Sequence, residues 1–187
     1  MTNKIITITA GHSSVGKIDS GAVTTDNGVV VKESEIAVKL RNAILHYIQQ
    51  EKDITTRCDG YGQTNLELKD AIKLIAGSTV AVEIHTNSSA NKTANGVECI
   101  ALPKDKALAQ KLSAAVAKVT GSRLRGDKGF ITQEESARGK LGYVSNNGLI
   151  LEVFFLSNDA ELHTFNEKYW LIAKEVAQVL IDYVKSK

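Results

Sequence analysis

Apolar residues recur at two spacings along this chain. Short runs rich in Ile, Val and Thr predict strands, whereas apolar residues three or four positions apart predict amphipathic helices. We expect strands at 4–10, 53–57, 79–85, 96–102 and 148–155. We expect helices at 33–50, 65–75, 104–119 and 169–185, and a short helix capped by Asn158 with Glu161 at its third position.

The order of these elements indicates the fold class. Strands that alternate with helices predict one α/β domain with a mostly parallel sheet and helices on both faces. Functional sites in such sheets lie beyond the carboxyl ends of the strands. Residues 11–32 contain four glycines and predict a long loop, which in a compact domain is usually functional. Residues 122–144 are also expected to be irregular.

Length and composition limit the kinds of protein that this chain can be. With 187 residues, the whole chain 1–187 is expected to form one domain, with nothing left over for a separate binding module. A net charge of +2 is too small to indicate nucleic acid as the main partner. No stretch approaches the ~20 apolar residues that span a bilayer, and no secretory signal is recognised. We therefore expect a protein that is not inserted in a membrane. We also expect a monomer, with Cys58 and Cys99 as buried thiols.

Three side chains are candidates for binding a metal ion. His12 and His85 each follow an apolar strand, and Glu33 opens the helix 33–50. The ends of parallel strands meet at one edge of a sheet, so the two imidazoles can converge there. The start of a helix also favours a carboxylate. Two imidazoles and one carboxylate leave the fourth position of a zinc ion open for water, which is typical of hydrolytic sites.

A fourth candidate lies inside the last strand. Glu152 interrupts the apolar run 149–155. A buried carboxylate is costly unless it is paired or its pKa is shifted. A position near the metal would account for Glu152, and a raised pKa would suit general acid–base catalysis.

Each of these residues also has a simpler interpretation. A histidine after a strand is often a hydrogen-bonded loop residue, and Glu33 is explained by its place at a helix start. Glu152 could pair with a buried arginine. The four residues together are harder to explain in this way, but their spacing alone leaves both interpretations open.

Five segments, in order along the chain, carry a family resemblance. They are Gly11-His12, Asp19-Ser20-Gly21-Ala22, Lys32-Glu33-Ser34-Glu35, Glu83-Ile84-His85-Thr86-Asn87 with Asn95-Gly96-Val97-Glu98, and Leu151-Glu152-Val153-Phe154-Phe155-Leu156-Ser157-Asn158. Together they resemble the zinc-dependent N-acetylmuramoyl-L-alanine amidases of the amidase_3 type. That family has a GHG-like turn, a D-P-G-A-type loop, an E-x-D-type helix start, an S-I-H-x-N…G-V-E segment and a closing L-E-x-G-F-x-S-N. The resemblance covers almost the whole chain.

The resemblance implies roles for the candidate residues. It implies one Zn²⁺ per chain bound by His12, Glu33 and His85, with Glu33 rather than Glu35 as the ligand from the helix start. It implies that Glu152 is the catalytic carboxylate. The bond cleaved would be the amide between N-acetylmuramic acid and the L-alanine of the peptidoglycan stem. The implied fold is a twisted sheet of about six strands flanked by helices.

The chain departs from the family pattern at several positions. Ser20 replaces the usual proline, Phe154 stands where glycine is usual, and Glu83 stands where serine is common. By strand alternation Glu83 faces the same side as His85. We expect Glu83 to orient a metal ligand as a hydrogen-bonded carboxylate, and simple lining of the cleft is the alternative.

Three further residues are candidate substrate contacts. Arg125-Gly126-Asp127-Lys128 resembles the R-G-x-K segment of phage-type members, so Arg125 and Lys128 could meet a muropeptide carboxylate. A solvated basic loop is an equally good interpretation of this segment. Asn87 could bind substrate or hold the loop that follows His85.

These features together predict a single-domain peptidoglycan amidase that resembles a phage or prophage endolysin. Such an enzyme would accumulate in the host bacterial cytoplasm and act on the cell wall after the membrane is opened. A bacterial autolysin is one alternative. A zinc peptidase or deacylase of another wall amide is a second, and an inactive wall-binding protein is a third.

Overall fold

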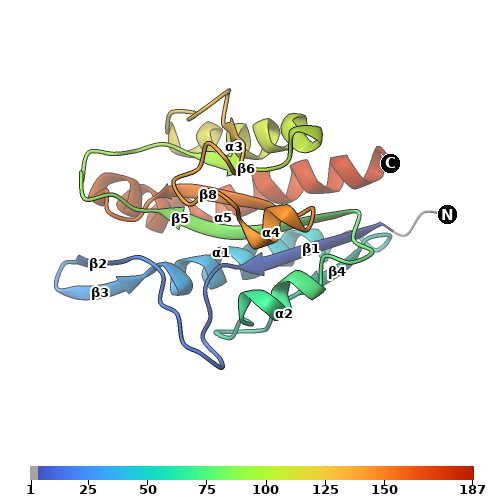
Figure 1. The fold of residues 1–187 in the computed structure, drawn as a ribbon, viewed down its shortest axis with the longest axis horizontal. Coiled ribbons are helices and arrows are strands. Elements are labelled where there is room, and N and C mark those ends of the chain that lie inside the picture. The colour runs from blue at the N-terminus through green and yellow to red at the C-terminus, as the bar shows by residue number, and fades with distance from the viewer. Residues whose placement is uncertain (1–3) are drawn as a thin grey trace.

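The computed structural model describes residues 4–187, which fold around one central sheet with a separate β-hairpin (Figure 1). The strands are β1 (Ile5–Ala10), β2 (Val23–Asp26), β3 (Val29–Lys32), β4 (Thr55–Cys58), β5 (Val80–Asn87), β6 (Glu98–Ile100), β7 (Phe130–Ile131) and β8 (Leu149–Phe155). The helices are α1 (Glu33–Ile48), α2 (Leu68–Lys73), α3 (Lys106–Thr120), α4 (Gly142–Ser145) and α5 (Asp159–Lys185), with a 3₁₀ turn at Pro103–Asp105.

The central sheet has six strands in the order β4-β1-β5-β8-β6-β7. Neighbouring strands are parallel, except that β6 runs antiparallel to β8. Parallel neighbours need long crossover connections, and the helices between the strands provide them. The predicted α/β domain with a mostly parallel sheet of about six strands is therefore confirmed.

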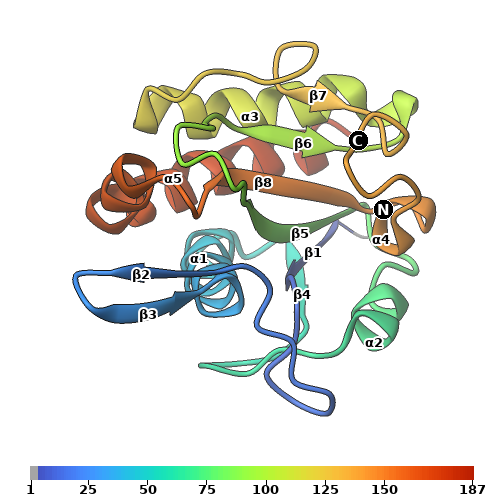
Figure 2. The same cartoon turned by 60° about the vertical axis from the view of Figure 1, so that its left-hand side comes forward.

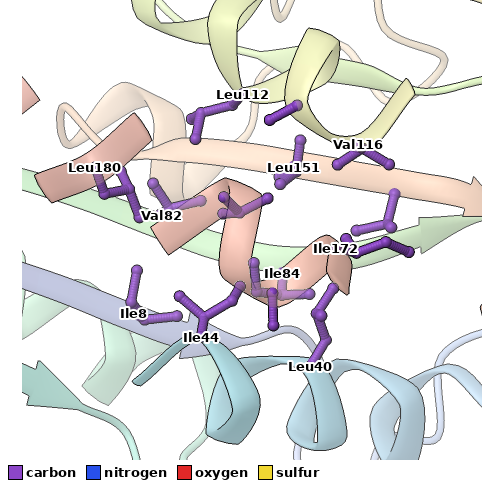
Figure 3. Packing of buried hydrophobic residues seen from close by; sticks show 14 of the residues in the cluster. Ile8, Leu40, Ile44, Val82, Ile84, Leu112, Val116, Leu151, Ile172 and Leu180 are labelled. Atoms are coloured by element: carbon purple, nitrogen blue, oxygen red, sulfur yellow. The ribbon is translucent and has the colours of Figure 1, made fainter. Parts of the chain in front are cut away.

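The two faces of the sheet are covered unequally. The long helices α1, α3 and α5 pack on one face, where Val82, Ile84 and Leu151 contribute to the main hydrophobic core (Figure 3). The short helices α2 and α4 cover part of the other face over a smaller cluster that includes Ala81 and Ile150. Side chains that alternate onto this second face near the carboxyl ends of the strands are therefore left accessible.

The prediction of a loop over residues 11–32 is wrong for its second half. Strands β2 and β3 form an antiparallel hairpin that projects beyond the central sheet (Figure 2). Asn27 and Gly28 at its tip have positive φ angles of 48° and 81°. This conformation suits the tight two-residue turns that Asn-Gly favours, so the hairpin follows from local sequence.

The C-terminal segment also differs from the prediction. Asn158 caps a helix, as expected, and its side chain accepts hydrogen bonds from Ala160 N and Glu161 N. The helix is not short, because α5 continues without a break to Lys185. Its buried residues keep the helical spacing throughout, so nothing in the pattern ends the first part. No described helix is both long enough and apolar enough to cross a membrane.

Two side chains near the cap have roles that local patterns do not show. Glu161 does not close a capping box but accepts hydrogen bonds from Gly96 N and Phe155 N. Phe154, at the position where glycine is usual, points into the core and stacks on Phe165 with ring centroids 5.0 Å apart. Its ring therefore packs on the face of the sheet opposite to Glu152.

Candidate active site

His12, Glu33 and His85 meet at the carboxyl ends of β1 and β5. One possible ligand atom from each lies within 4.8 Å of the other two. Glu33 Oε2 is 3.0 Å from His12 Nε2, and Glu33 Oε1 is 3.0 Å from His85 Nδ1. The structure thus brings together the three residues that the sequence singled out as ligands.

Glu33 is held in place by backbone groups from two other segments. It is the first residue of α1 and is only 2% exposed. Its carboxylate accepts hydrogen bonds of 2.9 Å from Ala22 N and Thr86 N. Glu35 instead lies on the surface, where it pairs with Lys32. Glu35 is therefore not part of the ligand cluster.

A second carboxylate fixes the far side of each imidazole. His12 Nδ1 lies 2.9 Å from Asp19 Oδ2, and His85 Nε2 lies 3.1 Å from Glu83 Oε2. A carboxylate at this place selects the tautomer that turns the other ring nitrogen toward a metal. Glu83 thus lies where an orienting residue would, and Asp19 is a counterpart that the sequence analysis did not assign.

The electrostatics of the cluster suit a divalent cation. Burial lowers the pKa of His12 and His85, but the neighbouring carboxylates outweigh it and raise both pKa values. Burial likewise raises the pKa of Glu33, but the two adjacent imidazoles outweigh burial and hold this pKa well below its usual range. The Glu33 carboxylate therefore stays negatively charged between the imidazole nitrogens of His12 and His85.

One nitrogen of the cluster has no hydrogen bond. His12 Nε2 is buried and, within residues 4–187, makes no hydrogen bond despite its short distance to Glu33. A buried polar atom without a partner is costly unless something else satisfies it. Two imidazole nitrogens and one carboxylate are also the donors of many catalytic zinc sites. The residues present therefore fit a zinc ion.

Two glycines allow the ligands to approach one another. A Cβ on Gly11 would lie 2.2 Å from Cε1 of the His85 ring. A Cβ on Gly21 would lie 2.5 Å from the His12 ring and 2.6 Å from Glu33 Oε2, and Gly21 has a φ of +65°. Any side chain at either position would displace a ligand.

We predict that Gly11→Ala weakens zinc binding by about tenfold or more, because displaced ligand geometry costs affinity on that scale. Zinc affinity would be measured by competition with a chelator. Gly142→Ala is a suitable control, since its new methyl group would lie 3.2 Å from Ile72 Cδ1 and 3.8 Å from Leu68 Cδ2, and none of the three ligands is among its neighbours. Equal affinity of Gly11→Ala and the unmodified protein would contradict this steric role.

Glu152 lies beside the ligands on the same face of the sheet. On β8 it is paired in register with His85 of β5 and with Glu98 of β6. Burial is the main cause that raises the pKa of Glu152 to about 7, the charges of Glu33 and Glu98 add to it, and His85 and Arg138 oppose it. Glu152 Oε2 is buried and makes no hydrogen bond within the described residues. This carboxyl group can therefore both accept and donate a proton near neutral pH.

The four residues lie in a cleft of about 1350 Å³. Asn87 and Arg125 also line it and share one partner: Asn87 Nδ2 donates to Glu98 Oε1 at 2.8 Å, and Arg125 Nε donates to Glu98 Oε2 at 2.5 Å. The Arg125 guanidinium also lies 4.9 Å from the centre of the Phe155 ring. Lys128 is exposed and is not among the residues that line the cleft.

The segment between β7 and α4 forms another part of the cleft wall. It contributes Glu135 and Arg138 among others. Arg138 is exposed and lines the cleft, so its guanidinium is available to an anionic group of a ligand. The sequence pattern does not reveal this part of the cleft, because an irregular segment has no periodicity that predicts its path across a sheet.

Comparisons with known proteins agree with this geometry. The sequence profile described as Amidase_3, N-acetylmuramoyl-L-alanine amidase, matches residues 6–182. A solved protein from Neisseria meningitidis, to which N-acetylmuramoyl-L-alanine amidase activity is attributed, is 40% identical, with a TM-score of 0.86 over 97% of this chain and 96% of that chain. No curated protein sequence matches.

Two further solved structures are similar. The catalytic domain of CwlV, an N-acetylmuramoyl-L-alanine amidase from Bacillus (Paenibacillus) polymyxa var. colistinus, is 26% identical, with a TM-score of 0.81 over 98% of this chain and 99% of that chain. The catalytic domain of the CD27L endolysin, which targets Clostridia difficile, is 19% identical and shares the fold, with a TM-score of 0.67 over 99% of this chain and 98% of that chain. The profile match spans nearly all of the chain, and the chain therefore belongs to the Amidase_3 family of N-acetylmuramoyl-L-alanine amidases.

Proposed function

We propose that this protein hydrolyses the amide bond between N-acetylmuramic acid and L-alanine in peptidoglycan, with one zinc ion bound by His12, Glu33 and His85. The observation that supports it best is the position of Glu152. Glu152, a half-buried residue whose carboxyl group has its pKa raised to about 7, lies next to a two-histidine, one-carboxylate cluster in an open cleft. The substrate is assigned from the membership of this chain in the Amidase_3 family.

Each part of the site has a separate task in this reaction. When bound, zinc supplies Lewis-acid chemistry: it lowers the pKa of a water molecule toward ~7 and polarises a carbonyl. Asp19 and Glu83 hold the two imidazoles in the orientation that the cluster requires. Sheet and helix backbone hold the three ligands rigidly, so little reorganisation is needed during the reaction.

Glu152 moves the proton that hydrolysis requires. It takes a proton from the attacking water as the hydroxyl oxygen bonds to the lactyl carbonyl carbon. The carbon–nitrogen bond then breaks, and Glu152 gives the proton to the departing nitrogen of L-alanine. The products are a muramic acid carboxylate and a stem peptide with a free amino terminus. A pKa near neutrality makes both transfers feasible.

We further propose that the protein acts as a monomeric phage or prophage endolysin, made in the host bacterial cytoplasm. The resemblance of Arg125-Gly126-Asp127-Lys128 to phage-type members supports this role, and the fold is shared with an endolysin catalytic domain. A bacterial autolysin with the same activity is the alternative. Lysis of producing cells only after their membrane is opened with chloroform would distinguish the endolysin from an exported autolysin.

The test of the activity is mass spectrometry of purified peptidoglycan after digestion. We predict stem peptides that begin with a free L-alanine amine, a loss of this product with a chelator, and its recovery when zinc is added. Stems cut internally but still attached to muramic acid would indicate a wall peptidase instead. No cleavage in the presence of zinc would contradict the proposed function and favour an inactive wall-binding protein.

A further inference from the structure

We propose that Asn65 is the positioning residue for the ligand His12. Its side-chain amide holds the backbone of residues 10–14 in the conformation that directs the His12 imidazole toward Glu33 and His85. The role of His12 as a zinc ligand rests on the proposed function, but the positioning itself does not. The sequence pattern had placed Asn65 at the start of a helix, whereas α2 begins only at Leu68.

His12 needs such support because its backbone conformation is unfavourable. Its φ angle is +68°, in the left-handed region that residues with a Cβ atom rarely adopt. Conformations of this kind persist only where surrounding contacts impose them. The chain leaves β1 at Ala10 and must turn at once to bring the imidazole over the end of β5. A different φ at this residue would point the ring elsewhere.

The side chain of Asn65 contacts every residue of this turn except Ser13. Its Nδ2 lies 3.1 Å from Ala10 O, 3.3 Å from Gly11 O and 2.9 Å from His12 O. Its Oδ1 accepts a hydrogen bond of 2.9 Å from Ser14 N. Asn65 is 0% exposed. The whole polar group of a fully buried side chain is thus directed at the segment that carries His12.

Other contacts hold the backbone of this turn at its flanks but not at its centre, where Asp19 contacts only the His12 ring. On one side, Ala10 N donates to the Asp59 carboxylate and Gly11 N donates to Ile84 O. On the other side, Ser13 and Asp19 exchange two backbone hydrogen bonds. These contacts stop at Gly11 and resume at Ser13, and the bond from Asn65 to His12 O lies between them. We therefore expect the flanks to remain folded without Asn65, while the backbone of His12 is no longer fixed and its ring, hydrogen-bonded to Asp19 alone among the described residues, changes direction.

The experiment compares Asn65→Ala with Ile44→Val in the full-length protein. Ile44 lies on α1, packs in the main core (Figure 3) and is not one of the residues that line the cleft, so Ile44→Val should lower Tm without altering the contacts of His12. Zinc affinity would be measured by competition with a chelator. We expect Asn65→Ala to lower this affinity about tenfold or more, the scale found when the support of a ligand is removed. Ile44→Val should retain the affinity of the unmodified protein.

A second readout needs neither metal nor substrate. Imidazole NMR signals of the metal-free protein report the environment of each histidine, with the exposed His46 and His163 as internal references. Asn65→Ala should shift or broaden the His12 signals and leave the two references unchanged. Asn65→Ser, which keeps a short hydroxyl group, is the milder variant if Asn65→Ala does not fold, and the same criteria apply to it.

The outcomes separate this inference from the proposed function. Zinc affinity equal to that of Ile44→Val, together with unchanged His12 signals, would overturn the positioning role and leave Asn65 a purely structural residue. If the unmodified protein binds no zinc, the proposed function fails, and the His12 signals still decide whether Asn65 positions the imidazole.

Discussion

Replacing Glu152 by glutamine is expected to lower kcat for amide hydrolysis by about 10²–10⁴-fold, the usual contribution of a general acid–base residue. Glutamine has nearly the same shape but can neither take the proton from water nor give it to the departing nitrogen. Glu152 is not part of the ligand cluster, so zinc content should be unchanged. Release of stem peptides from peptidoglycan and metal analysis of the purified variant would measure the two effects.

Glu167→Gln is the matched control for this substitution. Glu167 lies on α5 with a side chain that is 59% exposed, and its ion pair is with His163 on the surface. The same chemical change there should leave both activity and zinc content intact. If Glu152→Gln kept activity within about threefold of the unmodified enzyme, another group would have to carry the proton, and the assignment of Glu152 would be wrong.

The second large effect concerns stability. Asp59→Ala is expected to lower the free energy of unfolding by about 3–5 kcal/mol, the range for a buried ion pair that loses one partner. Arg41 and Asp59 have fully buried side chains, and Arg41 Nη1 lies 2.8 Å from Asp59 Oδ1. Asp59 also accepts from Ala10 N at 3.2 and 3.3 Å. Denaturant unfolding monitored by circular dichroism would measure the loss, and Tm should fall by about 10 °C at about 2–4 °C per kcal/mol.

The order of two substitutions tests the physical reason for this loss. Asp59→Ala leaves a guanidinium buried that cannot lose its proton. Arg41→Met leaves a carboxyl group that can become neutral, since burial raises the pKa of Asp59 and the Arg41 charge only partly opposes it. Asp59→Ala should therefore be the more destabilising change.

Asp53→Ala provides the control for the buried pair. Asp53 pairs with Lys4 at 3.0 Å, but this pair is exposed to solvent, and exposed ion pairs contribute little to stability. A loss of stability as large for Asp53→Ala as for Asp59→Ala would contradict the explanation from burial.

Much of this protein could be predicted from local patterns. The strands at 79–85 and 148–155 and the helix at 33–50 match β5, β8 and α1 closely, because burial imposes a characteristic spacing of apolar residues on each element. His12 and His85 became candidates because each follows an apolar strand, at the edge of the sheet where sites lie. Glu152 became a candidate because a carboxylate inside an apolar strand is costly unless it is paired or its pKa is shifted.

Some local signals were present but were read incorrectly. The Asn27-Gly28 turn between two β-rich runs predicts the hairpin that the structure contains, yet the many glycines of residues 11–32 favoured a loop. The pair Asn158 and Glu161 matches a capping box, but only the Asn158 half forms. The Glu161 carboxylate instead accepts hydrogen bonds from Gly96 N and Phe155 N, because these tertiary hydrogen bonds compete with the local one.

What the sequence determined by itself was the order of the main strands and helices, the α/β class and the residue types of the candidate site. Only the tertiary structure decided which polar groups meet. It placed Asp19 behind His12, excluded Glu35, joined Arg125 to Glu98, and directed Asn65 to the turn that carries His12. Periodicity reports whether a side chain faces the core. A hydrogen bond between residues 53 positions apart, such as that from Asn65 to His12, depends on the path of the whole chain.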